Sequence, residues 1–369
     1  MENIGIYINI LIILFLVSKF FIDKIISKEV FLLFILSSTG PILLNLTPVI
    51  YNIFPDQGGY YDNIVIFRDY YNFDILRHSD QNKFLTLILT FIPLPSVDNI
   101  ISAVYLNKFL LFSLIIYLIK FNYIKNYQAI ILLLYPSLFL YSSLFLKETV
   151  IIVFLTISYI YLIKEKYLFS ILCIGLVFFV KANLALLFVA IYGLYIVLYY
   201  LKPSLQKIIY ILILSGLLFI VLGLHSNLLE QLNLLIFNFN MEASNYSKES
   251  QLFDKNLIGI NLKSFLLIFK SSISFWFKPL IYKATSLSEL GQSIENILIF
   301  ITLAYFLKKL YLIDIKKTYF LITALLITSL PYAIIVSNVG TLSRYRFSII
   351  IIFMIIIFFE LNQNKKNEK

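Results

Sequence analysis

The feature that most constrains this chain is a series of apolar runs, each long enough to cross a lipid bilayer as a helix. The hydrocarbon core of a bilayer is about 30 Å thick, which a helix crosses in about 20 residues. Backbone groups must be satisfied inside lipid, and the runs lack the alternation of barrel strands, so we expect helices. We expect eleven spans, at residues 4–22, 30–50, 100–119, 127–143, 149–163, 168–181, 184–200, 208–224, 292–307, 318–336 and 346–360.

The composition agrees with a chain that lies mostly in lipid. In this chain 60% of the residues are hydrophobic and 14% are charged, against about 45–50% apolar and about 25% charged in soluble domains. A soluble fold cannot bury so much apolar surface, which excludes a soluble enzyme, a disordered chain and a nucleic-acid-binding module. The predicted fold class is all-α: a polytopic integral membrane protein with about 11 transmembrane helices, in which residues 1–369 form a single membrane domain.

Lysines in the short connections predict the orientation of the chain. Every second connection carries a lysine pair, as with Lys24 and Lys28 or Lys120 and Lys125. Positive charge accumulates in cytoplasmic loops, so these connections are predicted to be cytoplasmic. The N-terminus is then outside and the C-terminus is in the cytoplasm. The net charge of +10 is thus ascribed to topology, and no nucleic-acid partner is expected.

Two long connections, residues 51–99 and 225–291, are predicted to be extracytoplasmic loops. The first is rich in aspartate, and Asp56 and Asp62 lie just past the second span. Such a carboxylate can act as general base toward a sugar hydroxyl or hold a divalent cation. The alternative is a solvated acidic turn, because Asp-Gln-Gly-Gly is also typical of turns.

The second long loop contains an apolar stretch, residues 261–283, that is predicted to form an interfacial helix on the outer leaflet. Lys263, Lys270 and Lys278 are spaced seven and eight residues apart, which places them on one helical face. The alternative is a further span, which would break the lysine alternation.

Arginine is scarce in this chain, which has 26 lysines and four arginines: Arg68, Arg77, Arg344 and Arg346. All four fall on the predicted outer side, and guanidinium groups bind phosphate bidentately, so the pattern favours an anionic, phosphate-bearing substrate. The alternative is packing against loop carboxylates.

The last two arginines lie in residues 337–349, at the predicted outer mouth of the last span. Residues two apart diverge by about 200° on a helix, so Arg344 and Arg346 could hold one ligand only if this stretch is partly unwound. Asn338 and Gly340 favour such a loop. The alternative is interfacial snorkelling of the two side chains.

Polar residues also occur at or inside the apolar boundaries. Charges at these depths are costly and usually face a cavity or a partner. Lys108, within the third span, could instead mark a span that starts later, and Lys147 and Glu148 could be ordinary loop residues. The residues concerned are Lys108, Lys147, Glu148, Lys181, Asn183, Glu295 and Asn296.

Four stretches resemble parts of multi-span bacterial sugar-polymer enzymes, the O-antigen polymerase type and related lipid-linked-sugar glycosyltransferases. Two positions depart from the usual pattern: Lys181 and Lys278 stand where arginine is frequent. A third, Ala182, replaces a frequent proline. The stretches are YPSLFLYSSLFLKE (135–148), FVKAN (179–183), FWFKPL with GQSIEN (275–280 and 291–296), and NVGTLSRYRFSI (338–349).

The resemblance implies the polymerisation of polyprenyl-diphosphate-linked oligosaccharide repeat units into O-antigen or a similar surface polysaccharide. The reaction would occur at the outer face of the bacterial cytoplasmic membrane. Basic side chains would stabilise the charge that develops on the leaving diphosphate, and Asp56, Asp62 or Glu148 would position or deprotonate the acceptor. The expected substrate-binding residues are Arg68, Lys147, Lys181, Asn183, Lys278, Glu295, Asn296, Asn338, Arg344 and Arg346.

The expected partners are the lipid-linked glycan, the bilayer and a chain-length regulator. No cofactor or metal ligand is expected, although a divalent cation stays open. One alternative is a transferase that moves a monosaccharide from a polyprenyl-phosphate sugar. Others are a lipid-linked glycan transporter and a purely structural membrane protein.

Overall fold

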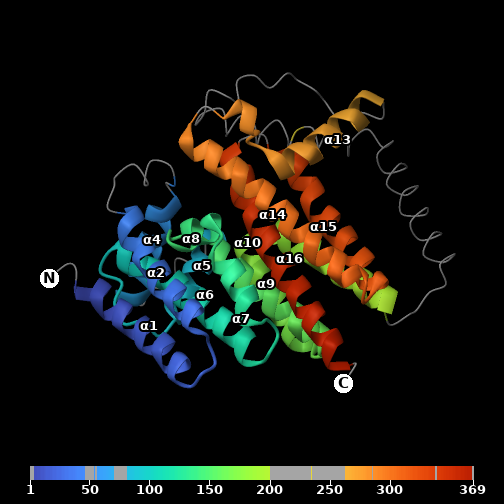
Figure 1. Cartoon of the computed structure of the whole chain (residues 1–369). Coiled ribbons are helices and arrows are strands. Elements are labelled where there is room, and N and C mark those ends of the chain that lie inside the picture. The colour runs from blue at the N-terminus through green and yellow to red at the C-terminus, as the bar shows by residue number, and fades with distance from the viewer. Residues whose placement is uncertain are drawn as a thin grey trace. The chain divides into compact units, whose positions relative to one another are not determined.

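A computed structural model describes residues 4–45, 54, 56–69, 81–199, 234, 262–284, 286–336 and 339–367 (Figure 1). This part of the chain is helical and contains no strand, which confirms the all-α class for the residues described. Seven of its helices are long and apolar enough to cross a membrane. They are α1 (Ile4–Ile22), α2 (Lys28–Asn45), α6 (Ile100–Lys120), α10 (Tyr167–Tyr199), α14 (Leu287–Tyr311), α15 (Ile315–Ile335) and α16 (Val339–Asn367).

The remaining described helices are shorter. The predicted span at 127–143 is divided into α7 (Asn126–Leu133) and α8 (Pro136–Ser142), because a proline cannot continue the preceding helix. The predicted span at 208–224 lies outside the described residues, so the count of eleven stays a prediction. The other short helices are α4 (Asp56–Asp69), α5 (Gln81–Thr90), α9 (Glu148–Ile163), α13 (Leu262–Phe277) and the 3₁₀ turn η3 (Ile281–Lys283).

The chain divides into two compact units. Unit 1 comprises Met1–Leu186 with Ile350–Lys369, and unit 2 comprises Leu187–Ile349. In unit 1, α6 lies at the centre, in contact with α1, α2, α8 and α9. Its side chains are buried along most of its length, and Tyr105 and Phe112 are among the largest. In unit 2, α13 packs against α14 and α15.

Three of the lysine-paired connections meet at one end of unit 1. The Ser27 N–H donates to Asn126, which joins the connection after α1 to the one after α6. The Lys164 ammonium, after α9, donates to the Tyr123 hydroxyl. Asn362, near the end of α16, donates to the Tyr123 carbonyl at 3.0 Å. These contacts bring the connections after α1, α6 and α9 to the same end of unit 1. The lysine pattern predicts that these three connections share one side of the membrane.

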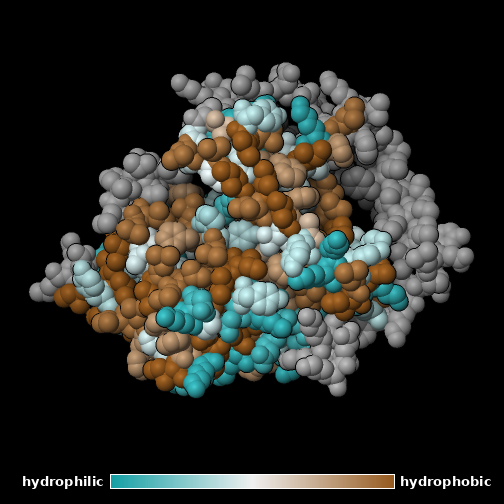
Figure 2. Space-filling model, viewed as in Figure 1, coloured by the Kyte–Doolittle hydropathy of each residue, from teal (hydrophilic) through white to brown (hydrophobic). Residues whose placement is uncertain are grey.

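Apolar side chains cover much of the surface that Figure 2 shows. On α14 the exposed residues include Ile294, Leu298 and Ile301, which recur at helical spacing. Exposed apolar surface of this extent is typical of a protein in lipid. Hydrophilic side chains gather along the lower edge of this view, where Figure 1 shows the connections after α1 and α6.

Candidate functional site

The polar interior of unit 1 is built around an interrupted helix. Residues 143–147 are not helical and connect the end of α8 to the start of α9; we call them the α8–α9 link. A helix break leaves backbone N–H and C=O groups without their usual partners, and such groups are tolerated at membrane depth only when protein or a cavity satisfies them. The link is therefore where side chains must supply hydrogen bonds.

Two asparagines satisfy the carbonyls of the link. The Asn107 Nδ2 group on α6 donates to the carbonyls of Leu144 and Leu146, both at 2.9 Å. The Asn45 Nδ2 group at the end of α2 donates to the carbonyl of Ser143 at 3.0 Å. Both asparagines are buried. Each thus replaces backbone bonds that a continuous helix would have made.

A glutamine completes this arrangement from a third element. The Phe145 N–H donates to Gln57 Oε1 on α4 at 2.8 Å, and Gln57 is fully buried. We call Asn45, Gln57 and Asn107 the amide clamp. Nearby, a Cβ at Gly40 would collide with the Ser143 hydroxyl, so α2 can approach the link this closely only at a glycine.

The clamp fixes the position of two charged residues at the junction of the link with α9. Lys147 is the N-cap residue of α9 and is half-buried, and Glu148 is the first residue of the helix and is fully buried. A carboxylate is favoured at a helix N-terminus, where backbone N–H groups point outward. Glu148 is therefore an interior residue of unit 1, and the alternative of an ordinary loop residue is wrong.

A lysine is buried close to the start of the link. Lys108 has 0% exposure and donates to the hydroxyls of Ser37 at 2.9 Å and Ser142 at 2.8 Å. Its ammonium also lies 5.2 Å from the centre of the Phe139 ring, a favourable cation–π distance. Because α6 begins at Ile100, Lys108 is well inside the helix, and the alternative of a later-starting span is wrong.

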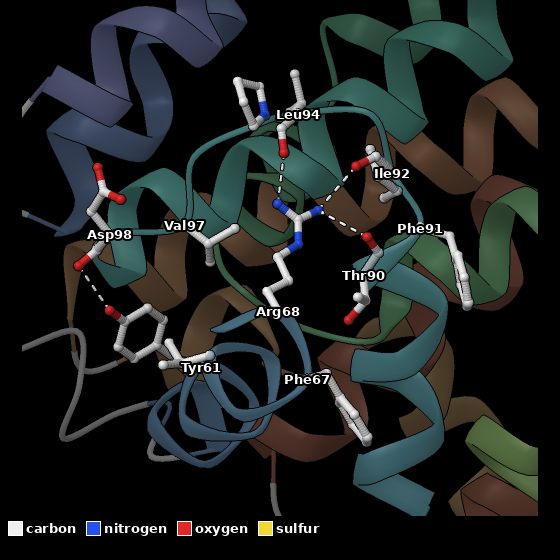
Figure 3. Close-up of a pocket in the computed structure, with 11 residues that line it drawn as sticks. Tyr61, Phe67, Arg68, Thr90, Phe91, Ile92, Leu94, Val97 and Asp98 are labelled. Carbon is white, nitrogen blue, oxygen red and sulfur yellow. Dashed lines mark hydrogen bonds between the residues drawn. The ribbon is translucent and has the colours of Figure 1, made fainter. Parts of the chain in front are cut away.

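A half-open pocket of about 660 Å³ lies at the end of α4 (Figure 3). Its lining includes Tyr61, Arg68, Phe91 and Asp98. The Tyr61 hydroxyl donates to the Asp98 carbonyl at 2.8 Å, while the Asp98 carboxylate points away from the guanidinium and accepts from Ser96. The pocket size is in the range of small-molecule sites.

Arg68 donates to backbone carbonyls beside this pocket. Its Nη1 donates to Leu94 at 2.6 Å, and its Nη2 donates to Leu89, Thr90 and Ile92 at 2.9–3.3 Å. These carbonyls belong to the last turn of α5 and the chain that follows it. The guanidinium fork thus stabilises the end of a neighbouring helix.

In unit 2, segments from two of the motif stretches converge on one peptide group. The Lys278 carbonyl accepts from Arg346 Nη1 at 2.7 Å and from Asn296 Nδ2 at 3.0 Å. We call this contact the Lys278 junction. Glu295 and Asn296 are both buried in α14. Arg346 Nη1 also donates to the Phe275 carbonyl at 2.8 Å, so this guanidinium satisfies the C-terminal end of α13.

The expected unwinding around the last two arginines is wrong for the described residues. Helix α16 begins at Val339, so Gly340, Arg344 and Arg346 are all helical. An isolated glycine costs a helix only about 1 kcal/mol. The two arginine side chains therefore diverge: Arg346 is buried at the Lys278 junction and Arg344 is half-buried. They cannot both hold one ligand in the way proposed for an unwound stretch.

The other predicted site residues in the described ranges lie on two helices, α4 and α10. Asp56 and Asp62 are exposed on α4, which is helical from Asp56 and so is not the acidic turn weighed above. Lys181 is buried and has non-helical backbone angles inside α10, and Asn183 is exposed. This break lies between the predicted spans 168–181 and 184–200. Asn338 and Arg77 fall outside the described residues.

Unit 1 contains a further buried polar group that the sequence pattern does not predict. Glu360 is buried in α16 and accepts from the Tyr159 hydroxyl on α9 at 2.7 Å. Asn362, two residues further on, donates to Gln128 at 2.8 Å. The signal available in the sequence is the carboxylate of Glu360 at the end of an apolar run, where it marks the end of the predicted span 346–360.

No three His, Cys, Asp or Glu side chains come together as cation ligands within the ranges described. No protein-family model, curated protein or solved structure matches this chain. Any assignment of function therefore depends on the residues and contacts above.

Proposed function

We propose that this chain is a membrane-embedded glycosyltransferase that joins polyprenyl-diphosphate-linked oligosaccharide repeat units. The observation that carries the proposal is the buried Glu148 at the start of α9, behind a link held by three amide side chains. A buried ionisable residue in a membrane protein is costly, and it is usually retained for function. Glycosyl transfer needs such a carboxylate to orient or deprotonate the acceptor hydroxyl.

Basic side chains near interruptions of the helices would bind the diphosphate in this proposal. Lys147 is the last residue of the α8–α9 link, and Lys181 lies at the break in α10. We leave Arg68 and Arg346 out of this set, because their guanidinium groups donate to backbone carbonyls. The proposed location is the outer face of a bacterial cytoplasmic membrane, with the N-terminus outside.

Deletion of the gene with analysis of surface glycans on a gel tests the proposal. Loss of the long ladder, with single repeats retained, is the expected result. Complementation by Glu148→Gln should fail to restore the ladder, whereas Asp56→Asn and Asp62→Asn, at exposed positions, should restore it. A normal ladder with Glu148→Gln in folded protein would remove Glu148 from the mechanism. An unchanged ladder in the deletion strain would reject the polymerase function itself.

The monosaccharide transferase stays as an alternative within the same class. It requires that the purified protein transfer one sugar from a polyprenyl monophosphate donor without elongating repeats. That result would exclude the polymerase and leave the role of Glu148 to be tested with the new substrate.

A specific observation favours a second function, the transport of a lipid-linked glycan. Two of the apolar segments are interrupted, one at the α8–α9 link and the other at Lys181. Many transporters bind their substrates at discontinuous helices. Flipping of lipid-linked glycan by vesicles that contain the purified protein, without formation of a glycosidic bond, would favour this function.

A further inference from the structure

Helix α13 in unit 2 has an exposed apolar stripe. Leu266 and Phe269 are 56% and 60% exposed, and Ile273 one turn further on is exposed as well. Residues at this spacing lie on one side of a helix. Lys270, adjacent in sequence to Phe269, is also exposed and lies on the same side. The opposite side contains the fully buried Phe275 and packs against α14 and α15.

The described part of α13 is shorter than a membrane span. Its 16 residues correspond to a length of about 24 Å, against the about 30 Å of a hydrocarbon core. Among the described residues, α13 is not one of the helices long and apolar enough to cross a membrane. An amphipathic helix with a lysine beside its apolar stripe is typical of helices that lie in the membrane interface.

The C-terminal end of α13 also suits an interfacial position. Arg346 donates to the carbonyls of Phe275 and Trp276, so these groups do not need water. Trp276 is the only tryptophan in the chain and is half-buried at this end. Tryptophan is enriched at the level of lipid headgroups, where its ring is apolar and its N–H can reach a polar partner.

We propose that α13 docks on the surface of an anionic lipid bilayer, with Leu266, Phe269 and Ile273 at the acyl boundary and Lys270 at the headgroup phosphates. Lipid fits better than a protein partner because α14, against which α13 packs, carries exposed apolar residues along a helix long enough to span a membrane. The ammonium group of Lys270 supplies the complementary charge for an anionic headgroup. This inference does not depend on the proposed glycan chemistry.

Fluorescence of Trp276 in the full-length protein tests this docking, because its emission reports on this helix alone. The protein is reconstituted in phosphatidylcholine vesicles whose lipids carry bromine, a quencher, either near the headgroup or at the middle of the acyl chain. Stronger quenching by the bromine near the headgroup is expected. Equal or stronger quenching by the mid-chain bromine, or no quenching at all because water or a protein covers the stripe, would overturn the proposal.

The anionic preference is tested with a small fraction of brominated phosphatidylglycerol in place of brominated phosphatidylcholine. Wild-type protein should be quenched about two- to fivefold more by the anionic lipid. The substitution Lys270→Glu should remove this difference, whereas Lys308→Glu, at an exposed lysine in the last turn of α14, should preserve it. Equal quenching by both lipids in wild-type protein, or a difference that survives Lys270→Glu, would reject the role of the lysine.

Discussion

At the scale of single residues, two arginines perform the same structural task in different units. The Arg68 guanidinium donates to carbonyls at and after the end of α5, and the Arg346 guanidinium donates to carbonyls at and after the end of α13. The last carbonyls of a helix lack intrahelical partners, and a planar guanidinium can satisfy several at once. A lysine ammonium has a different geometry and fewer donors. This explains the use of arginine at these two positions in a lysine-rich chain without reference to a ligand.

The substitution Arg346→Lys should therefore lower stability. The buried bond to the Phe275 carbonyl and the part-buried bond to the Lys278 carbonyl would be lost, which costs on the order of 1–3 kcal/mol. The thermal transition of the detergent-solubilised protein, followed by Trp276 fluorescence, should move to lower temperature. Arg344→Lys, at the half-buried neighbour, serves as the comparison. If the thermal transition of Arg346→Lys is unchanged and glycan transfer is lost, Arg346 binds the substrate and does not stabilise the fold.

Lys108 offers a different test at the residue scale. Replacing a buried charge by an apolar side chain of similar volume is often neutral or stabilising. Lys108→Met should therefore leave the thermal transition unchanged or raise it, since Ser142 keeps its bond to the Leu138 carbonyl. If the lysine is retained for function, the same variant should lose activity. Marked destabilisation would instead show that Lys108 holds α6 against its neighbours.

At the scale of elements, interrupted helices concentrate the polar contacts of unit 1. The α8–α9 link has lost helical bonds, and Asn45, Gln57 and Asn107 replace them. Polar side chains that would be unfavourable elsewhere in an apolar bundle are required here, because backbone groups must find partners. The interruption and the buried amides are thus two parts of one arrangement.

Removal of one clamp member should release the link. In a Cys173→Ala background, the substitution Leu146→Cys places a thiol at a position that is buried in the wild-type chain. Adding Asn107→Leu removes the donor to two carbonyls and should increase labelling by a membrane-impermeant maleimide. Asn183→Leu, at an exposed asparagine, is the matched control and should leave the labelling unchanged. Equal protection in both variants would show that the clamp does not hold the link.

The break in α10 predicts an unusual tolerance of proline. Lys181 has φ −156° and ψ 79°, which lies outside the α region that a following proline disfavours. Proline is also well suited to the first position of a helix. Ala182→Pro should therefore change stability by less than about 1 kcal/mol, whereas Ala185→Pro, inside the following helix, should cost about 3 kcal/mol. Comparison of the two thermal transitions checks this, and equal losses would contradict it.

At the scale of the whole molecule, the lysine pattern and the contacts of unit 1 group the same connections together at one end of the helices. The connection after α1 contacts the start of α7, and Lys164 contacts Tyr123. At the other end of α1, Asn9 donates to the Ser96 and Ser102 carbonyls, which brings the predicted outer loop to this helix. The contacts place the connections on two ends, and the positive-inside rule predicts which end is cytoplasmic.

Labelling of single cysteines in the Cys173→Ala background tests that prediction. Asn122→Cys, Glu165→Cys and Ile313→Cys, all at exposed positions, should react only after the membrane is permeabilised. Pro95→Cys, also exposed, should react with an impermeant reagent in intact cells. The reverse pattern would place the predicted outer motifs inside the cell and would reject the proposed glycan chemistry at the outer face.

The sequence by itself determined where many of the helices lie. Residues 4–22 were predicted as a span, and α1 has the same bounds; Glu148 and Lys181 were picked out, and each lies at the end or the interruption of a helix. A helix satisfies its own backbone hydrogen bonds, so the position of a membrane helix can be predicted from its apolar run alone. Helix α16 extends beyond the predicted span 346–360 at both ends, because polar and charged residues continue the helix outside the apolar run.

Only the tertiary structure decided which polar groups meet. Asn107 reaches carbonyls 37 and 39 residues away, and Arg346 reaches carbonyls about 70 residues away. No periodicity within a helix encodes such pairs, because a side chain and the backbone group that it satisfies are joined by packing between elements. Two of the four arginines that suggested a phosphate ligand, Arg68 and Arg346, are hydrogen-bonded to the ends of helices in the fold.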